Sequence, residues 1–201
     1  MELQKKHRYF CTTLLLVGLS VLPALIKADI TIDESTSYYD ITGSSTSELR
    51  ESIYANSKVD RSTHGFDAST NWSISWQFDV LAEATGCRVN STNITAKIKY
   101  RLPRWQAFET STDTTLTKEW GRYIDHLTRH EYIHGEITKV AVNSIELTLL
   151  DLHNGAPDIS CEDLRTKAYI RVAELITALR HRHEKFDLDT DHGTKNTRLL
   201  P

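Results

Sequence analysis

The chain has 201 residues, of which 39% are hydrophobic and 25% are charged, so it is long and apolar enough for one domain with a hydrophobic core. Residues 1–28 hold four of the 24 Lys and Arg and one of the 27 Asp and Glu, which leaves 20 basic and 26 acidic side chains and a net charge of −6. This acidic balance argues against nucleic acid and anionic lipid as partners.

The N-terminus has the organisation of a secretory signal peptide. "KKHR" is a positive segment, "YFCTTLLLVGLSVLPALI" is an uncharged and mostly apolar run, and the composition turns polar after Ala28. Pro23 and the small side chain of Ala28 favour cleavage after residue 28, so we expect an exported protein, periplasmic or secreted. An uncleaved membrane anchor is the alternative, since the run is near spanning length. After cleavage we expect no further contact with the membrane.

Two cysteines remain in the segment of residues 29–193, which we expect to be a single α+β domain followed by a flexible tail of residues 194–201. In an oxidising compartment Cys87 and Cys161 most simply form one disulfide. Two buried free thiols are the alternative.

The first half of the domain is predicted to form an antiparallel sheet with one short helix. Trp72 to Val80 alternate apolar and polar residues, and Ile94 to Leu102 do the same, so both are half-buried strands. The Gly and Asn residues of "EATGCRVNST" predict a turn between two antiparallel neighbours. Upstream, "ITIDESTSYYDIT" can add a strand, and "STSELRESIYANS" predicts a short capped helix with Glu48 in its first turn.

The second half is predicted to be a long antiparallel helical hairpin. Gly155 and Pro157 separate two helical patterns, and Ser160 or Asp158 can cap the second one. The first pattern forms one continuous stripe with spacings of three and four: Trp120, Tyr123, Leu127, His130, His134, Ile137, Ala141, Ile145, Thr148 and Leu152. The second pattern places Leu164, Ala168, Val172, Leu175 and Leu179 on one face.

The stripe contains the sequence "HEYIH", in which His130, Glu131 and His134 have the order H-E-x-x-H. Positions i and i+4 bring two imidazoles to one helix face, as a zinc site requires, and the intervening Glu can reach a water on the metal. Two histidines that only pack against the partner helix are the alternative. A pair of uncoordinated imidazoles on an apolar stripe would be costly, which favours the metal.

A catalytic zinc site needs a third protein ligand and one open position. The second helix returns toward the His pair near its end, where several candidate ligands lie: His183, Asp187, Asp189, Asp191 and His192. The spacing of these residues does not decide among them.

The chain resembles a bacterial family of unknown function described as predicted secreted zinc-dependent proteases. The segments that carry the resemblance span nearly the whole domain: "YYDITGSSTSELRESI", the Trp72 and Trp76 pair, "GCRV", "LPRW", "HEYIHG" and "FDLDTDHG". The resemblance implies His192 as the third ligand, with Asp187 as a residue behind the ligands or an alternative ligand.

We therefore expect an exported zinc metallopeptidase that acts on a protein or peptide substrate. Zn²⁺ is expected on His130, His134 and His192, and Glu131 is the expected general base. Tyr123, Tyr132 and His183 are candidates for stabilising the oxyanion. The alternative is a zinc-stabilised binding module without turnover, closed by Asp187 or His183. The sequence predicts no oligomeric state.

Overall fold

The computed structural model describes three stretches of the chain, residues 27–57, 66–154 and 158–193. The predicted signal peptide therefore lies almost wholly outside the described residues, and the predicted tail lies outside them entirely. The predicted turn at Gly155 and Pro157 also lies outside them, whereas the helices on either side of it are described.

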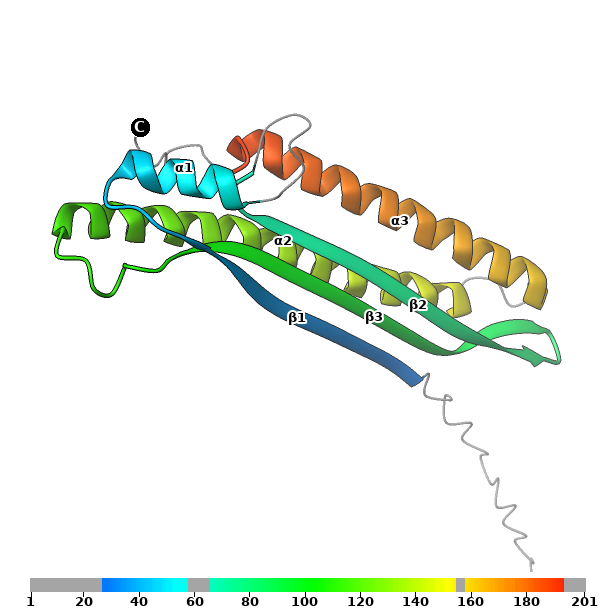
Figure 1. The fold of residues 1–201 in the computed structure, drawn as a ribbon. Coiled ribbons are helices and arrows are strands. Elements are labelled where there is room, and N and C mark those ends of the chain that lie inside the picture. The colour runs from blue at the N-terminus through cyan, green and yellow to red at the C-terminus, as the bar shows by residue number, and fades with distance from the viewer. Residues whose placement is uncertain (1–26, 58–65, 155–157, 194–201) are drawn as a thin grey trace, which may run out of the picture.

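Three long strands form one sheet in the order β1-β3-β2 (Figure 1). They are β1 (Lys27–Ile41), β2 (Ser69–Glu83) and β3 (Gly86–Trp105). β2 and β3 are antiparallel, but β1 pairs with β3 in parallel. The expectation of a wholly antiparallel sheet is therefore wrong, and the sheet is mixed. Alternation shows which side chains share a face, but it is the same for either pairing direction, so it could not reveal this.

The connection between β2 and β3 is shorter than predicted. Only Ala84 and Thr85 lie between the paired residues Glu83 and Gly86, so the sequence from Cys87 onward belongs to β3. Asn90, which had suggested a turn, is exposed in a strand with one solvent-facing side, where a polar residue is equally suitable.

Three helices complete the fold, α1 (Thr46–Asn56), α2 (Thr114–Asn154) and α3 (Cys161–Thr190). Each begins beside a capping side chain whose oxygen accepts an N–H of the first turn: Ser45, Asp113 and Ser160. α2 and α3 lie side by side and run in opposite directions, as the predicted hairpin requires (Figure 1). The described residues therefore form an α+β domain.

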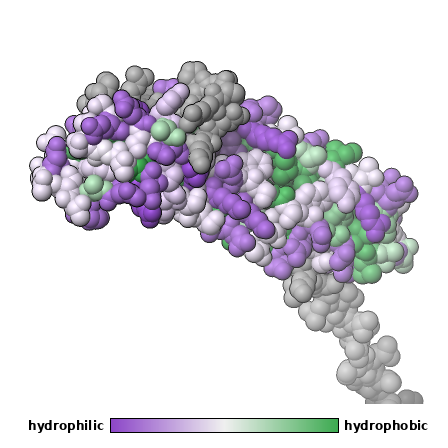
Figure 2. All heavy atoms as spheres, viewed as in Figure 1, coloured by the Kyte–Doolittle hydropathy of each residue, from purple (hydrophilic) through white to green (hydrophobic). Residues whose placement is uncertain are grey.

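Both long helices cover the same face of the sheet, and the other face is open. α2 lies against β3, while α3 contacts β2 and β3 (Figure 1). Along β2 the side chains alternate between exposed and half-buried, as expected when only one face is covered. The side of the molecule drawn in Figure 2 is mostly hydrophilic, with apolar residues visible mainly toward the end that carries the β2–β3 turn. None of the described helices is long and apolar enough to cross a bilayer.

Two separate hydrophobic clusters lie between the sheet and the helices, and both use α2. We call the first core the set Tyr39, Ile41, Leu49, Ile53, Ala68, Leu102, Trp105, Leu116, Trp120, Tyr123 and Leu127. We call the second core the set Cys87, Val89, Ile94, Ala96, Val142, Ile145, Leu149, Leu152, Leu164, Ala168 and Val172. The segment of α2 between Leu127 and Val142 belongs to neither core, and it carries the H-E-x-x-H sequence.

The predicted disulfide is present in the second core. Cys87 at the start of β3 and Cys161 at the start of α3 form a bond across 74 residues of sequence, with their Cα atoms 5.0 Å apart. It ties the N-terminal end of α3 to the sheet.

Candidate metal centre

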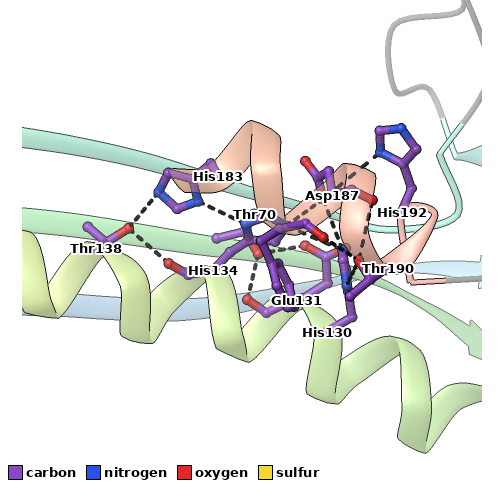
Figure 3. Close-up of polar contacts among 10 residues, drawn as sticks. Thr70, His130, Glu131, His134, Thr138, His183, Asp187, Thr190 and His192 are labelled. Carbon is purple, nitrogen blue, oxygen red and sulfur yellow. Dashed lines mark hydrogen bonds and ion pairs between the residues drawn. The ribbon is translucent and has the colours of Figure 1, made fainter. Parts of the chain in front are cut away.

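Three side chains from two helices converge between the two cores (Figure 3). His130 Nε2 and His134 Nε2 on α2 are 3.3 Å apart. Asp187 Oδ1 on α3 lies 3.2 Å from the first nitrogen and 2.9 Å from the second. Both histidines are buried, and the Asp187 side chain is 28% exposed. These three residues are a group that could hold a metal ion.

A hydrogen-bonded chain behind His134 fixes the tautomer of its ring. The Thr138 hydroxyl donates to the carbonyl of His134 at 3.0 Å, so toward His183 Nε2, 3.4 Å away, it can only accept. His183 Nε2 therefore carries the proton of a neutral ring, and its Nδ1 accepts from His134 Nδ1–H at 2.8 Å. It follows that His134 Nε2 presents a lone pair to the site.

The neutral state of His183 agrees with its surroundings. Burial, reinforced by the neighbouring His134, lowers the pKa of His183 to about 4. Trp72 of β2 stacks on the ring with a centroid distance of 5.3 Å and an interplanar angle of 18°. Both nitrogens of His183 are thus engaged with His134 and Thr138, which leaves neither of them for a metal ion.

His130 is oriented in the same way from the end of α3. The hydroxyl of Thr190 donates to the carbonyl of Phe186 at 2.6 Å, so it can only accept from His130 Nδ1–H at 3.4 Å. His130 Nε2 then also presents a lone pair to the site. The ring of Phe186 stacks on His130 at 4.8 Å and meets His134 edge-on, which holds both imidazoles in place.

The donor set fits a small, tetrahedrally coordinated cation. The ordinary pKa of an aspartate lies far below neutral pH and the side chain of Asp187 is partly exposed, so it supplies a carboxylate. Three electron-pair donors thus face one another at 2.9–3.3 Å. Metal–ligand bonds of 2.0–2.1 Å in a tetrahedron place neighbouring ligands about 3.3–3.4 Å apart. The observed spacing is close to that value, and a shared cation removes the repulsion between the lone pairs.

Glu131 lies beside this group and not within it. Its residue is 5% exposed, and the hydroxyl of Thr70 on β2 donates to Oε2 at 2.6 Å. Burial raises the pKa of Glu131, and the hydrogen bond from Thr70 opposes the shift only in part. A cavity of about 170 Å³ lies in front of these groups, lined by the beginning of β2 and by residues of α2 and α3.

His192, which the resemblance implies as third ligand, lies at the rim of this cavity. Its Nδ1 is 3.9 Å from Asp187 Oδ1, its side chain is 42% exposed, and its ring packs against Phe66 at 4.7 Å. Its role as a ligand stays a prediction. Gly193 follows at φ 76°, and a Cβ there would lie 2.8 Å from the ring of His130, so this position needs glycine.

The candidate oxyanion groups are engaged elsewhere. Tyr123 is buried and donates to Asp67 Oδ2 at 2.6 Å, and Arg50 binds the same carboxylate at 2.5 Å. Tyr132 is 45% exposed and packs against Tyr100 beside a different hollow. The carboxylate of Asp67 thus has a structural task, since it anchors the segment that leads into β2.

Three threonines of the site were not singled out from the sequence: Thr70, Thr138 and Thr190. Thr138 could have been found, because it lies four residues after His134 on the same helix face. The predicted stripe instead contained Ile137, which is only half-buried. The fully buried residue at this turn of the helix is its neighbour Thr138. Thr190 had a signal too, as it belongs to the segment "FDLDTDHG". Nothing in the sequence indicated Thr70.

Gly135, which directly follows the second histidine, faces Tyr100 of the sheet. A Cβ on Gly135 would lie 1.9 Å from the hydroxyl oxygen of Tyr100 on β3. That hydroxyl donates to Glu34 Oε1 on β1 at 2.7 Å, so Tyr100 passes across the helix at a position without a side chain.

The fold and the site together define an α+β protein with a candidate metal centre built on a helical hairpin. The chain belongs to a family of bacterial proteins of unknown function, DUF922, whose sequence model matches residues 36–193. No curated protein matched the chain, and no solved structure matched it. The match confirms the bacterial family of unknown function, and the peptidase activity implied by the resemblance stays a prediction.

Proposed function

We propose that this chain is an exported zinc-dependent peptidase in which His130, His134 and Asp187 hold the ion. The observation that carries the proposal is the convergence of three lone-pair donors beside one buried carboxylate, that of Glu131. Each histidine has its other nitrogen bound to a fixed partner, as metal-binding histidines almost always do. Export is supported by the predicted signal peptide, and the disulfide is compatible with an oxidising compartment.

The roles of the residues follow from their positions. A zinc ion would supply Lewis acidity, lowering the pKa of a water in its open position and polarising the scissile carbonyl. Glu131 then accepts the proton of the attacking water and delivers it to the leaving amine. Its raised pKa suits a group that carries a proton during part of the cycle. Thr70 holds Oε2 and leaves Oε1 for the proton.

The alternative is a metal-stabilised binding module without turnover, and the position of His192 is the observation that favours it. Its ring is next to Asp187, so a modest rotation would bring a fourth protein ligand to the ion. A closed set of four protein ligands is typical of a structural zinc site, whereas three ligands and water are typical of a catalytic one.

Metal analysis and one matched pair of variants test the proposal. The purified protein is loaded with zinc, and hydrolysis of an unfolded, fluorescently labelled protein is compared for wild type, Glu131→Gln and Glu136→Gln. Glu136 is the control, since it lies on the same helix with its side chain 66% exposed and paired with Lys139. We expect full zinc content in all three and a loss of activity of about two to four orders of magnitude only in Glu131→Gln. Zinc binding without hydrolysis in any of the three would favour the binding module, and equal hydrolysis in all three would exclude Glu131 as the general base.

A further inference from the structure

The two edges of the sheet differ in a way that points to a partner. β1 and β2 are both edge strands, because β3 lies between them. Natural edge strands are usually protected from pairing with another chain by charges or proline. β1 carries such charges along its length, at Asp29, Asp33, Glu34 and Asp40. β2 has neither a charge nor a proline from Ser69 to Phe78.

The unprotected stretch of β2 begins at the candidate metal centre. Residues 66–70 and Trp72 line the cavity together with His130, Glu131 and Asp187. Thr70 contacts the proposed general base directly. A chain that pairs with this part of β2 would therefore pass next to the groups that we assign to peptide hydrolysis.

β2 is also paired on one edge and packed on its inward face, so its remaining edge is placed for pairing. One edge of the strand is fully paired with β3. Its inward side chains are fixed by α3, where Trp72 stacks on His183 and Trp76 packs on Tyr169 at 4.9 Å. Its outward side chains on the open face are short and uncharged, at Asn71, Ser73 and Ser75. Among the residues that the structure describes, no backbone hydrogen bond reaches the other edge of this strand.

We propose that the free edge of β2 binds an extended segment of the substrate as an added strand. That the bound segment is then cleaved rests on the proposed function. In strand addition the main chain supplies the hydrogen bonds, and only alternate side chains meet the protein. The substrate class is then an unfolded or extended polypeptide with little sequence requirement. A folded helix is excluded, because its N–H and C=O groups are already paired.

Binding is tested separately from hydrolysis on the zinc-loaded Glu131→Gln protein. The probe is a synthetic, uncharged peptide of Thr, Val, Ser and Gln about as long as Ser69–Phe78, with blocked ends. Backbone amide exchange is measured by NMR with and without the peptide. We expect exchange at alternate residues of Ser69–Phe78 to slow by about tenfold or more, with β1 unchanged. No slowing in β2, or equal slowing in both edge strands, would overturn the inference.

Two controls distinguish backbone pairing from other contacts. A peptide N-methylated at every second amide keeps all N–H groups along one of its edges and should bind like its parent. A peptide methylated at consecutive amides should bind about tenfold more weakly or worse.

Ser75→Lys and Thr31→Lys form a matched pair of protein variants, since both residues flank Thr95 from opposite edges. Only Ser75→Lys should weaken binding. Equal weakening by both variants would refute pairing with β2. Retained binding without cleavage by the wild type would refute the peptidase and leave this inference standing.

Discussion

α2 passes through three regions that are stabilised by different means. In the first core and the second core its side chains are apolar and packed. Between them most of the buried polar side chains of the described residues are gathered: His130, Glu131, His134, Thr138 and His183. Buried polar groups cost free energy unless they are hydrogen-bonded, so a protein rarely concentrates them in one place for stability alone. The contrast is the reason why we place the proposed function in the middle region.

α3 shows the same contrast from its other side. Its N-terminal half contributes Leu164, Ala168 and Val172 to the second core and is joined to β3 by the disulfide. Beyond Leu179 its one buried helical side chain is His183. The C-terminal half of α3 is therefore held mainly by the residues of the candidate metal centre and their aromatic neighbours, which makes the two halves separable by experiment.

The largest expected effect concerns the second core. Cys87→Ser with Cys161→Ser removes a closed loop of 74 residues, and the chain-entropy model assigns about 4 kcal/mol to such a loop. We expect urea unfolding to show a loss of stability of that order. An unchanged midpoint would mean that packing alone secures this end of α3.

The next largest effect concerns the ligands between the cores. Asp187→Ala should lower zinc affinity as severely as His130→Ala, because each removes one of three converging donors. Removal of a residue behind the ligands typically costs about 10–100-fold, so His183→Phe and Thr190→Val should fall in that range. Zinc titration against a chelator measures all four. If His192→Ala loses the metal and Asp187→Ala keeps it, the ligand set implied by the resemblance is correct and the geometric one is wrong.

Periodicity predicted the regular parts of this molecule well. The alternation from Trp72 to Val80 and the stripe from Trp120 to Leu152 correspond to β2 and α2, since burial of one face imposes these periods. The parallel pairing of β1 was missed, because alternation does not depend on strand direction. The pairing of Cys87 with Cys161 followed from there being only two cysteines in residues 29–193.

The site was predictable where its residues are neighbours on one helix. His130, Glu131 and His134 could be placed from their spacing alone. The sequence placed the third candidate ligand near the end of α3 but did not choose between Asp187 and His192. Their positions relative to the His pair depend on how the backbone turns at the end of the helix. Asp191 and His192 both have positive φ there, a conformation uncommon for residues other than glycine. Thr70 comes from a strand 61 residues away, and only the packing of β2 against α2 brings it to Glu131.

Removal of the metal should separate the halves of α3. Without a cation His130, His134 and Asp187 lose the partner that joins α2 to α3, and few apolar contacts remain beyond Leu179. We expect hydrogen exchange of residues 183–190 to accelerate by about 10–100-fold in chelator-treated protein, with residues 164–172 unchanged. Equal exchange in both segments, with and without zinc, would show that packing holds the whole helix.

The smallest effect compares two glycines of α2, one near the first core and one at the metal centre. A Cβ on Gly121 would have no heavy atom within 4 Å, so Gly121→Ala should stabilise the protein by up to about 1 kcal/mol through helix propensity. Gly135→Ala gains the same propensity but forces the hydroxyl of Tyr100 away from α2 and from Glu34. Overpacking typically costs about 1–3 kcal/mol, so after the gain in propensity a net destabilisation of up to about 2 kcal/mol is expected. Urea unfolding of the two variants measures the two changes in stability, which we expect to have opposite signs. If Gly135→Ala is also stabilising, Tyr100 can move at no cost, and the glycine after His134 is not required by the approach of the sheet.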